Sequence, residues 1–134
     1  MKLHPILLIV SALLVITASA GAQENDNATA WGGRGILLRM TEQGATLQFE
    51  CAHGAIQQTI QPDAAGNFSV PGTYTPERGG PIQKDNASPD LPATYKGSIS
   101  GDTMHLEVIP SDKRLQPPPF TLTKGRMVKI VRCR

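Results

Sequence analysis

Residues 35–51 read GILLRMTEQGATLQFEC, and apolar side chains recur at every second position in both halves of this stretch. The positions that share this spacing are Ile36, Leu38, Met40, Leu47, Phe49 and Cys51. A period of two is typical of a β-strand that buries one face. The short polar run Glu42-Gln43-Gly44 between the halves is typical of a tight turn. The stretch therefore predicts two antiparallel strands that turn the same face toward a core.

The same pattern continues toward the carboxyl terminus. After strands at 35–41 and 46–52, further alternating segments cover residues 55–61, 67–75, 93–100, 103–109, 120–123 and 127–134. No segment after residue 20 carries the 3.6-residue period of an amphipathic helix. The chain therefore predicts an all-β fold, an antiparallel meander of about eight strands closed into a small barrel, with a β-sandwich as the alternative. Closure is favoured because it removes exposed strand edges.

The amino-terminal residues predict export from the cell. One early cation, Lys2, precedes an uncharged apolar run and then small residues, which is the layout of a secretory signal peptide. An uncleaved membrane anchor is the alternative, because the uncharged stretch is not far short of the ~20 residues that span a bilayer. We expect cleavage, and with it a signal peptide at residues 1–20, a flexible segment at 21–34 and a single barrel domain at 35–134. The expected location is the periplasm or the extracellular space.

The two cysteines, Cys51 and Cys133, predict a disulfide. An exported chain with an even number of cysteines pairs them by default. Such a bridge would tie the second predicted strand to the last, and the chain-entropy model gives so long a loop about 4 kcal/mol of stabilisation. The alternation places Cys51 on the inward face of its strand, beside Leu47 and Phe49. We therefore expect a structural bridge that starts from the core.

His53 follows Cys51 by two residues, and this spacing is also compatible with half of a metal site or with a reactive thiol beside its base. A zinc site needs three or four ligands. The chain after residue 20 offers two cysteines and two histidines, and His105 alternates outward elsewhere. His53 and Gly54 instead fit the two central positions of a type I′ hairpin turn, where both residues need positive φ. We expect His53 in a turn, and neither a metal site nor a cofactor.

Two stretches are candidates for binding a partner. The first is the loop from Pro76 to Pro92, which is longer than compact domains usually tolerate without a functional reason. Its charged side chains are the candidate contacts: Glu77, Arg78, Lys84, Asp85 and Asp90. The second is the basic carboxyl terminus, whose candidate contacts are Lys129, Arg132 and Arg134. A solvated insertion is the alternative for the loop, and a strand edge protected by cations is the alternative for the terminus.

Charge and motifs argue against several functional classes. The formal net charge is only +2, so no strong field favours nucleic acid. The sequence has neither a Gly-x-Ser-x-Gly elbow nor a phosphate-binding glycine loop, so no catalytic residue can be named. We expect a monomer that has no membrane contact after cleavage. Sequons at Asn27, Asn67 and Asn86 are acceptors only in a host that glycosylates exported proteins.

Five motifs run through nearly all of the chain that follows the signal peptide. They are WGG at Trp31, GATLQFECAHG from Gly44, GNFSVPGTYTPERGGP from Gly66, YKGSISGDTMHLEV from Tyr95 and FTLTKG from Phe120. This succession resembles a family of small exported bacterial β-proteins that has no assigned activity. The resemblance implies a fold-sized unit and no particular chemistry.

Two weaker likenesses concern single features. Trp31 stands just before the first predicted strand, which is similar to the tryptophan that plugs one end of lipocalin-like barrels. The stretch from Phe49 to Gly54 reads aromatic-x-Cys-x-x-Gly, and with a cysteine near the chain end it resembles periplasmic inhibitors of lysozyme. Their Ser-Gly-x-x-Tyr inhibitory segment is absent, and the nearest stretch here is Pro71-Gly72-Thr73-Tyr74.

Three functional hypotheses follow. The first is a secreted or periplasmic, non-enzymatic binding module that engages a protein partner, as an inhibitor or an adaptor does. The alternative is a carrier of a small apolar ligand of the lipocalin-like type, because a barrel of about eight strands can be filled by side chains or hold one small ligand. The third is an enzyme of unknown class.

Overall fold

The computed structural model describes residues 28–77 and 89–133. Its elements follow one another as β1 (Thr29–Gly33), β2 (Ile36–Thr41), β3 (Gly44–Phe49), β4 (Ala52–Ile56), β5 (Asn67–Pro76), β6 (Leu91–Ser100), β7 (Thr103–Pro110), η2 (Lys113–Leu115) and β8 (Phe120–Lys124). The predicted signal peptide lies outside the described residues, as do two of the sequons, Asn27 and Asn86. In the described part of the chain, no helix is long and apolar enough to cross a membrane.

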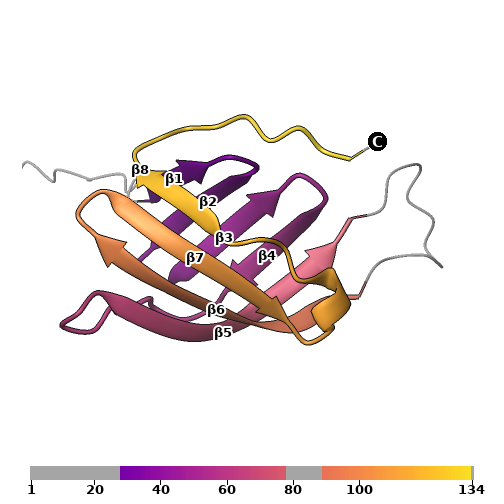
Figure 1. Cartoon of the computed structure of the whole chain (residues 1–134), viewed down its shortest axis with the longest axis horizontal. Coiled ribbons are helices and arrows are strands. Elements are labelled where there is room, and N and C mark those ends of the chain that lie inside the picture. Colours follow the sequence, from indigo (N-terminus) through magenta and orange to yellow (C-terminus); the bar gives the residue numbers. More distant parts are fainter. Residues whose placement is uncertain (1–27, 78–88, 134) are drawn as a thin grey trace, which may run out of the picture.

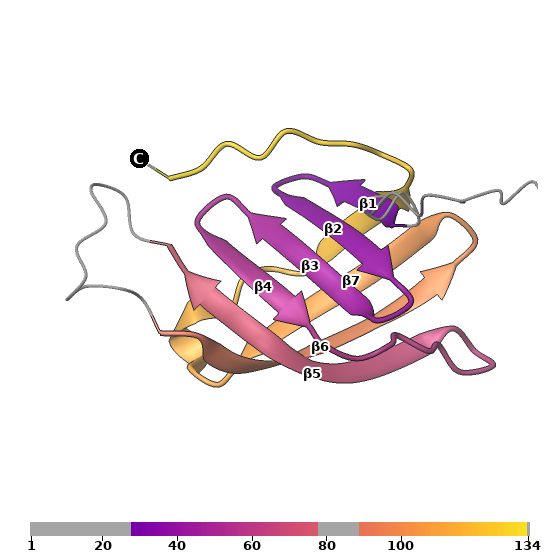
Figure 2. The same cartoon turned by 180° about the vertical axis from the view of Figure 1, so that it is seen from behind.

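The strands form one closed barrel in which each pairs antiparallel with its neighbours along the chain. The barrel closes where β1 pairs with β8, with Trp31 opposite Lys124 and Gly33 opposite Leu122. Figure 1 and Figure 2 show β1–β4 on one side of the interior and β5–β7 on the other. The predicted all-β meander of eight strands is therefore confirmed, and it closes as a barrel rather than packing as a sandwich.

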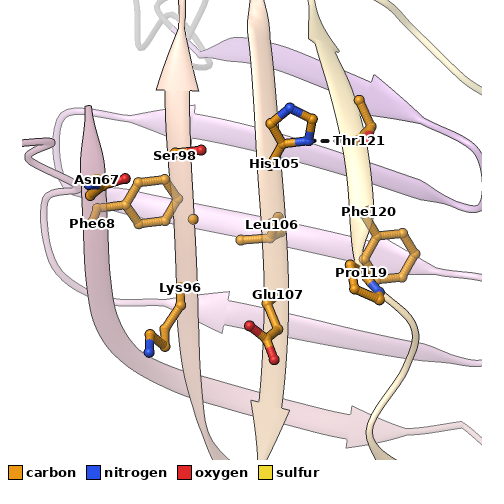
Figure 3. A pocket seen from close by; sticks show the side chains of 11 residues that line it. Asn67, Phe68, Lys96, Ser98, His105, Leu106, Glu107, Pro119, Phe120 and Thr121 are labelled. Carbon is orange, nitrogen blue, oxygen red and sulfur yellow. Dashed lines mark hydrogen bonds between the residues drawn. The ribbon is translucent and has the colours of Figure 1, made fainter. Parts of the chain in front are cut away.

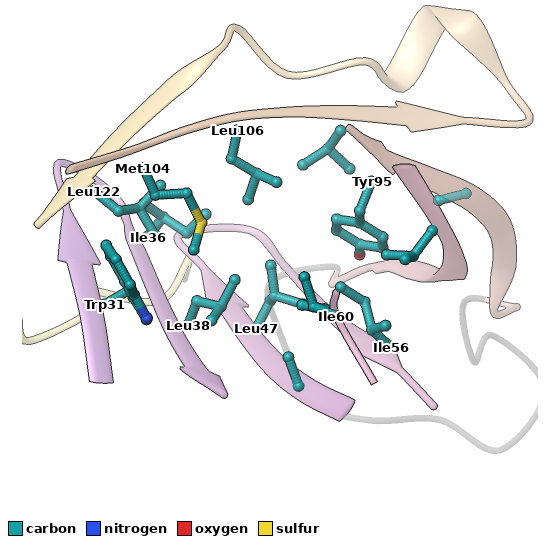
Figure 4. Packing of buried hydrophobic residues seen from close by; sticks show 14 of the residues in the cluster. Trp31, Ile36, Leu38, Leu47, Ile56, Ile60, Tyr95, Met104, Leu106 and Leu122 are labelled. Atoms are coloured by element: carbon teal, nitrogen blue, oxygen red, sulfur yellow. The ribbon is translucent and has the colours of Figure 1, made fainter. Parts of the chain in front are cut away.

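Side chains from alternate positions of the strands fill the interior. The buried cluster consists of Trp31, Ile36, Leu38, Ala45, Leu47, Phe49, Ala52, Ile56, Ile60, Phe68, Val70, Tyr74, Ala93, Tyr95, Met104, Leu106, Val108 and Leu122. Figure 4 shows side chains from opposite walls, such as Leu106 and Leu47, pointing into the same space. The alternation that the sequence predicts for β5 and β7 is confirmed by this burial, whereas in β2 the outward Leu37 is buried along with the inward Ile36 and Leu38.

The two ends of the barrel differ from the prediction. β1 lies inside residues 21–34, which the sequence predicts as a flexible segment, so the barrel begins at Thr29 rather than at residue 35. The TAWGG segment has no alternation of its own, and it becomes a strand because it pairs with β2 on one side and β8 on the other. Residues 127–133 form no strand, although the sequence predicts one there. Once β1 and β8 have paired, the barrel has no free edge for it.

The hairpin between β3 and β4 turns at Glu50 and Cys51 instead of at His53 and Gly54. Among the described residues only glycines have positive φ, so His53 does not adopt the predicted turn conformation and lies within β4. Cys51 is exposed, and the expectation that it faces the core is wrong. Because the turn comes earlier, Gly54 faces the interior, where Tyr95 fills the space beside it.

Tyr95 is a fully buried polar side chain whose position depends on two glycines. Its hydroxyl group donates a hydrogen bond of 2.6 Å to the Thr73 carbonyl oxygen. A Cβ atom on Gly54 would lie 2.1 Å from the Tyr95 hydroxyl oxygen, and one on Gly72 would lie 2.8 Å from a carbon of its ring. Burial, and next the nearby Tyr74, raise the pKa of Tyr95 above its ordinary value. The two glycines therefore leave the space that Tyr95, the largest fully buried side chain, occupies.

Gly54→Ala is expected to destabilise the barrel by about 1–3 kcal/mol, because the new methyl group overlaps the Tyr95 hydroxyl oxygen. In a Tyr95→Phe background the same change should cost less, since the closest overlapping atom is gone and the remaining close contact is the Thr73 carbonyl oxygen at 2.8 Å. Urea unfolding of the four proteins in this double-mutant cycle measures the coupling. Losses that add within about 0.5 kcal/mol would contradict the proposed contact.

Both tyrosines of the chain should ionise at a higher pH in the folded protein than in the unfolded chain. Burial raises the pKa of Tyr74 as well as that of Tyr95, whereas both phenols of the unfolded chain ionise near pH 10. Their stabilising effect is therefore complete below pH 10 and is lost as the pH rises through the folded pKa values. Tyrosinate absorbance at 295 nm, compared with the guanidinium-unfolded chain, checks this. A native midpoint near pH 10 would show that the phenols are solvated.

Candidate functional site

A carboxy-terminal strap, residues 125–133, crosses the outside of the barrel. It leaves β8 and runs past β1, β2 and β3 in both views of the molecule (Figure 1, Figure 2). At its start the Gly125 N–H donates to the Ala30 carbonyl oxygen at 2.7 Å, and at its end the Cys133 N–H donates to the Glu50 carbonyl oxygen at 2.9 Å. The predicted disulfide between Cys51 and Cys133 is present and joins the strap to the β3–β4 turn. The strap is thus held at both ends.

The inner side of the strap packs on the barrel wall. Val128 and Ile130 are half-buried, while their neighbours are exposed. A Cβ atom on Gly32 would lie 2.1 Å from the Arg126 carbonyl oxygen and 3.2 Å from a methyl carbon of Val128, so the strap lies directly on β1 there. Leu37, the register partner of Gly32, points outward from β2 and is nevertheless only 6% exposed. The strap therefore covers an apolar position on the outside of the barrel.

The outer side of the strap combines aliphatic and basic side chains. Met127 and Val131 are 61% and 71% exposed, the two highest values among the large apolar side chains of the described residues. Lys129 lies between them in the outward set, and Arg126 and Arg132, which fall at the same alternate positions as Val128 and Ile130, are also exposed. The sequence has no acidic residue from 124 onward. Exposed aliphatic side chains ringed by charge are typical of a surface that contacts another molecule.

A pocket of about 300 Å³ lies at the disulfide end of the strap and is called the strap pocket below. It is lined by Gln48, Phe49, Ala52, His53, Glu77, Ile130 and Arg132. The His53 Nδ1 atom lies 2.9 Å from Glu77 Oε1, where the carboxylate accepts the hydrogen bond. Two of the predicted contact residues, Glu77 from the loop and Arg132 from the terminus, therefore meet in one pocket.

The remaining predicted contact residues are divided. Lys129 lies exposed on the strap. Asp90 accepts a hydrogen bond from the hydroxyl group of the buried Thr75, so it holds the start of β6 against β5 and does not line the strap pocket. Four predicted contacts lie outside the described residues: Arg78, Lys84, Asp85 and Arg134.

His53 is the pocket residue that the sequence interpretation missed. The sequence predicts His53 in a turn and therefore not in a binding site. In the structure it lies in β4 and points outward, opposite Gln48 of β3. The alternation of β4 places His53 between the buried residues Ala52 and Gly54, and this pattern could have identified it as an outward strand residue. Its partner Glu77 lies 24 residues away, so no local pattern predicts their contact.

Two further pockets open on the outer wall. A groove of about 380 Å³ lies over β6 and β7, and His105 Nδ1 lies 3.3 Å from the Thr121 hydroxyl oxygen there. Figure 3 shows the side chains that line this groove. A second hollow, of about 650 Å³, includes Arg39, Thr46 and Gln57 in its lining. Across the residues that the structure describes, no group of three or more His, Cys, Asp or Glu side chains could hold a metal ion. The strap pocket is distinguished because it gathers charged groups from distant segments.

Comparisons with known proteins do not assign the chain to a family. No family model matches the chain, and no curated protein or solved structure matches it. The molecule is a small eight-stranded antiparallel barrel with one disulfide.

Replacing either cysteine, Cys51→Ser or Cys133→Ser, is expected to lower the free energy of unfolding by about 2–4 kcal/mol, because the unfolded chain loses a cross-link that closes a long loop. For a domain of this size the melting temperature should fall by roughly 10–30 °C. The double variant should lose no more than either single variant, since all three lack the same bond. Far-ultraviolet circular dichroism should be unchanged because the strap contains no strand.

Three results would contradict this account of the bridge. They are an unchanged melting temperature, additive losses in the double variant, and two free thiols titrated in the protein purified without reductant.

Proposed function

We propose that the protein is an exported, non-enzymatic binding module that engages a protein partner through the strap and the strap pocket. The observation that carries the proposal is the exposure of Met127 and Val131 on a segment fixed at both ends. Aliphatic side chains on a rigid backbone lose little conformational freedom when a partner covers them, and such preorganisation favours binding. The basic residues around them supply charge for steering and orientation.

The packing of the interior supports a partner-binding role over a ligand carrier. One continuous cluster of side chains, including Phe49, Phe68 and Tyr95, fills the barrel. The three pockets considered above all include exposed outer-wall residues in their linings. A barrel of about eight strands has an interior that side chains alone can fill.

The make-up of the strap pocket supports binding over nucleophilic catalysis. Its described lining residues include the pair formed by His53 and Glu77 but no Ser or Thr, and the adjacent cysteines are joined in the disulfide. A histidine activated by a carboxylate needs a nucleophile within hydrogen-bond reach. The same residues are well suited to hold a polar group of a partner.

One interior observation favours the carrier as a second candidate. The indole Nε1 atom of Trp31 is buried and has no hydrogen-bond partner among the described residues. A buried donor without a partner costs about 1–3 kcal/mol, which a bound acceptor or a water molecule would offset. Native mass spectrometry of the exported protein distinguishes the two candidates. An extra mass of a few hundred daltons would favour the carrier, and a bare mass would favour the partner-binding role.

Photo-crosslinking in the producing cells tests the proposal. The photoreactive residue p-benzoylphenylalanine replaces Met127 or Val131 on the strap, and in the control it replaces Lys96, which is exposed on β6. Both strap positions should give an adduct with the same protein, identified by mass spectrometry, and the Lys96 position should give none. The absence of adducts from the strap, or the same adducts from all three positions, would refute the proposed surface.

A further inference from the structure

Within the described residues, the strap has a row of main-chain groups without hydrogen-bond partners. Residues 127–132 make no main-chain hydrogen bond to any other residue described by the structure, although the strap is bonded at 125, 126 and 133. Val128 and Ile130 face the wall while Met127, Lys129 and Val131 face away, which is the alternation of an extended chain. Extended main chain with free N–H and C=O groups is a template on which another extended chain can pair.

The positive charge of the strap indicates which side chains the pairing segment should carry. Arg126, Lys129 and Arg132 are exposed, and no acidic residue lies within the strap to neutralise them. Like charges placed opposite each other in paired strands are destabilising, so the strap of a second copy is a poor partner. Opposite charges in the same positions are stabilising. The complementary occupant is an extended segment rich in Asp and Glu.

The strap pocket can bind one carboxylate of such a segment. Arg132 has no ion-pair partner among the described residues, where Glu77 is already engaged by His53. Guanidinium groups bind carboxylates with two parallel hydrogen bonds. Gln48 adds amide donors to the same lining. The volume of about 300 Å³ is at the small end for a ligand site and suits a side chain rather than a whole cofactor.

Taken together, these features favour a peptide over a lipid surface. Lipid phosphates would accept hydrogen bonds from the strap N–H groups, but they offer no donors to its carbonyl groups. We propose that the strap docks an extended acidic segment of the partner protein by main-chain pairing along residues 127–132, with one carboxylate of that segment held by Arg132 in the strap pocket. This inference rests on the proposed function and adds the chemistry and the geometry of the partner.

Fluorescence anisotropy with defined peptides tests this inference. The probe is a labelled octapeptide of alternating Glu and Val with blocked ends, titrated with the mature, disulfide-bonded protein. Two further probes carry N-methyl groups on every second residue, in the two alternate registers, and a last probe has Lys in place of Glu. The Glu–Val peptide should bind, at least one N-methylated register should bind about tenfold more weakly, and the Lys–Val peptide should not bind, because pairing needs N–H donors and acidic charge.

Charge variants of the protein locate the contact. Arg132→Gln and Lys129→Gln should each weaken binding of the Glu–Val peptide by about three- to tenfold, as expected for exposed charge-assisted contacts. Lys96→Gln, on the far wall, is the matched control and should leave binding unchanged. Equal melting temperatures of the variants and the unmodified protein would show that these differences do not come from misfolding.

Several results would overturn the inference. Undiminished binding of both N-methylated peptides would exclude main-chain pairing, and failure of the Glu–Val peptide to bind would exclude the acidic segment. Binding to vesicles of phosphatidylglycerol and phosphatidylcholine, without binding to the peptide, would assign the strap to a membrane. If the strap crosslinks to a partner in cells while the peptide fails to bind, the proposed function stands and the inference about its chemistry falls.

Discussion

Closure of the barrel by β1 against β8 is the constraint on which the rest of the structure depends. The seam consists of three residue pairs, Trp31 with Lys124, Gly32 with Thr123 and Gly33 with Leu122. It is tight, because a Cβ atom on Gly33 would lie 2.3 Å from the Thr121 carbonyl oxygen. Without this seam β1 and β8 would both be open edges, and Trp31 would lose the neighbours that bury it. The filled interior follows from closure, since all eight strands then turn one face inward.

Closure also determines where the chain can present a binding surface. With the interior filled and the sheet edges paired, the remaining residues after β8 can only cross the outside. Val128 and Ile130 keep the strap on the wall, and the bond from Cys133 to Cys51 fixes its end beside the β3–β4 turn. The result is an extended segment whose outer side chains face solvent. Its last residues meet Glu77, at the end of β5, in one pocket.

Most of the barrel could be predicted from the sequence because alternation directly reports which side chains face the core, as it does for Leu47 and Phe49. The TAWGG segment of β1 has no such alternation, and only its two neighbours make it a strand. The strap shows the opposite case, an alternating pattern without a strand. Its alternate residues Val128 and Ile130 are half-buried against the barrel wall, so the sequence has the period of a strand although residues 127–133 form none. Sequence reasoning also found Glu77 and Arg132 as charged candidates and the two cysteines as a pair. It could not place His53 beside them, because that contact depends on where the β3–β4 turn falls.

The most direct test of the account is the position and exposure of the strap in solution. Nuclear magnetic resonance of the oxidised protein can measure contacts between the methyl groups of Leu37 and Val128, and amide hydrogen exchange at residues 127–132, in one sample. We predict methyl contacts together with fast exchange, because the strap packs on the wall while the main-chain groups of residues 127–132 have no hydrogen-bond partner in the part of the chain that the structure describes. Missing methyl contacts would mean that the strap is not docked. Slow exchange would mean that its main chain is already paired, and either result would contradict the account.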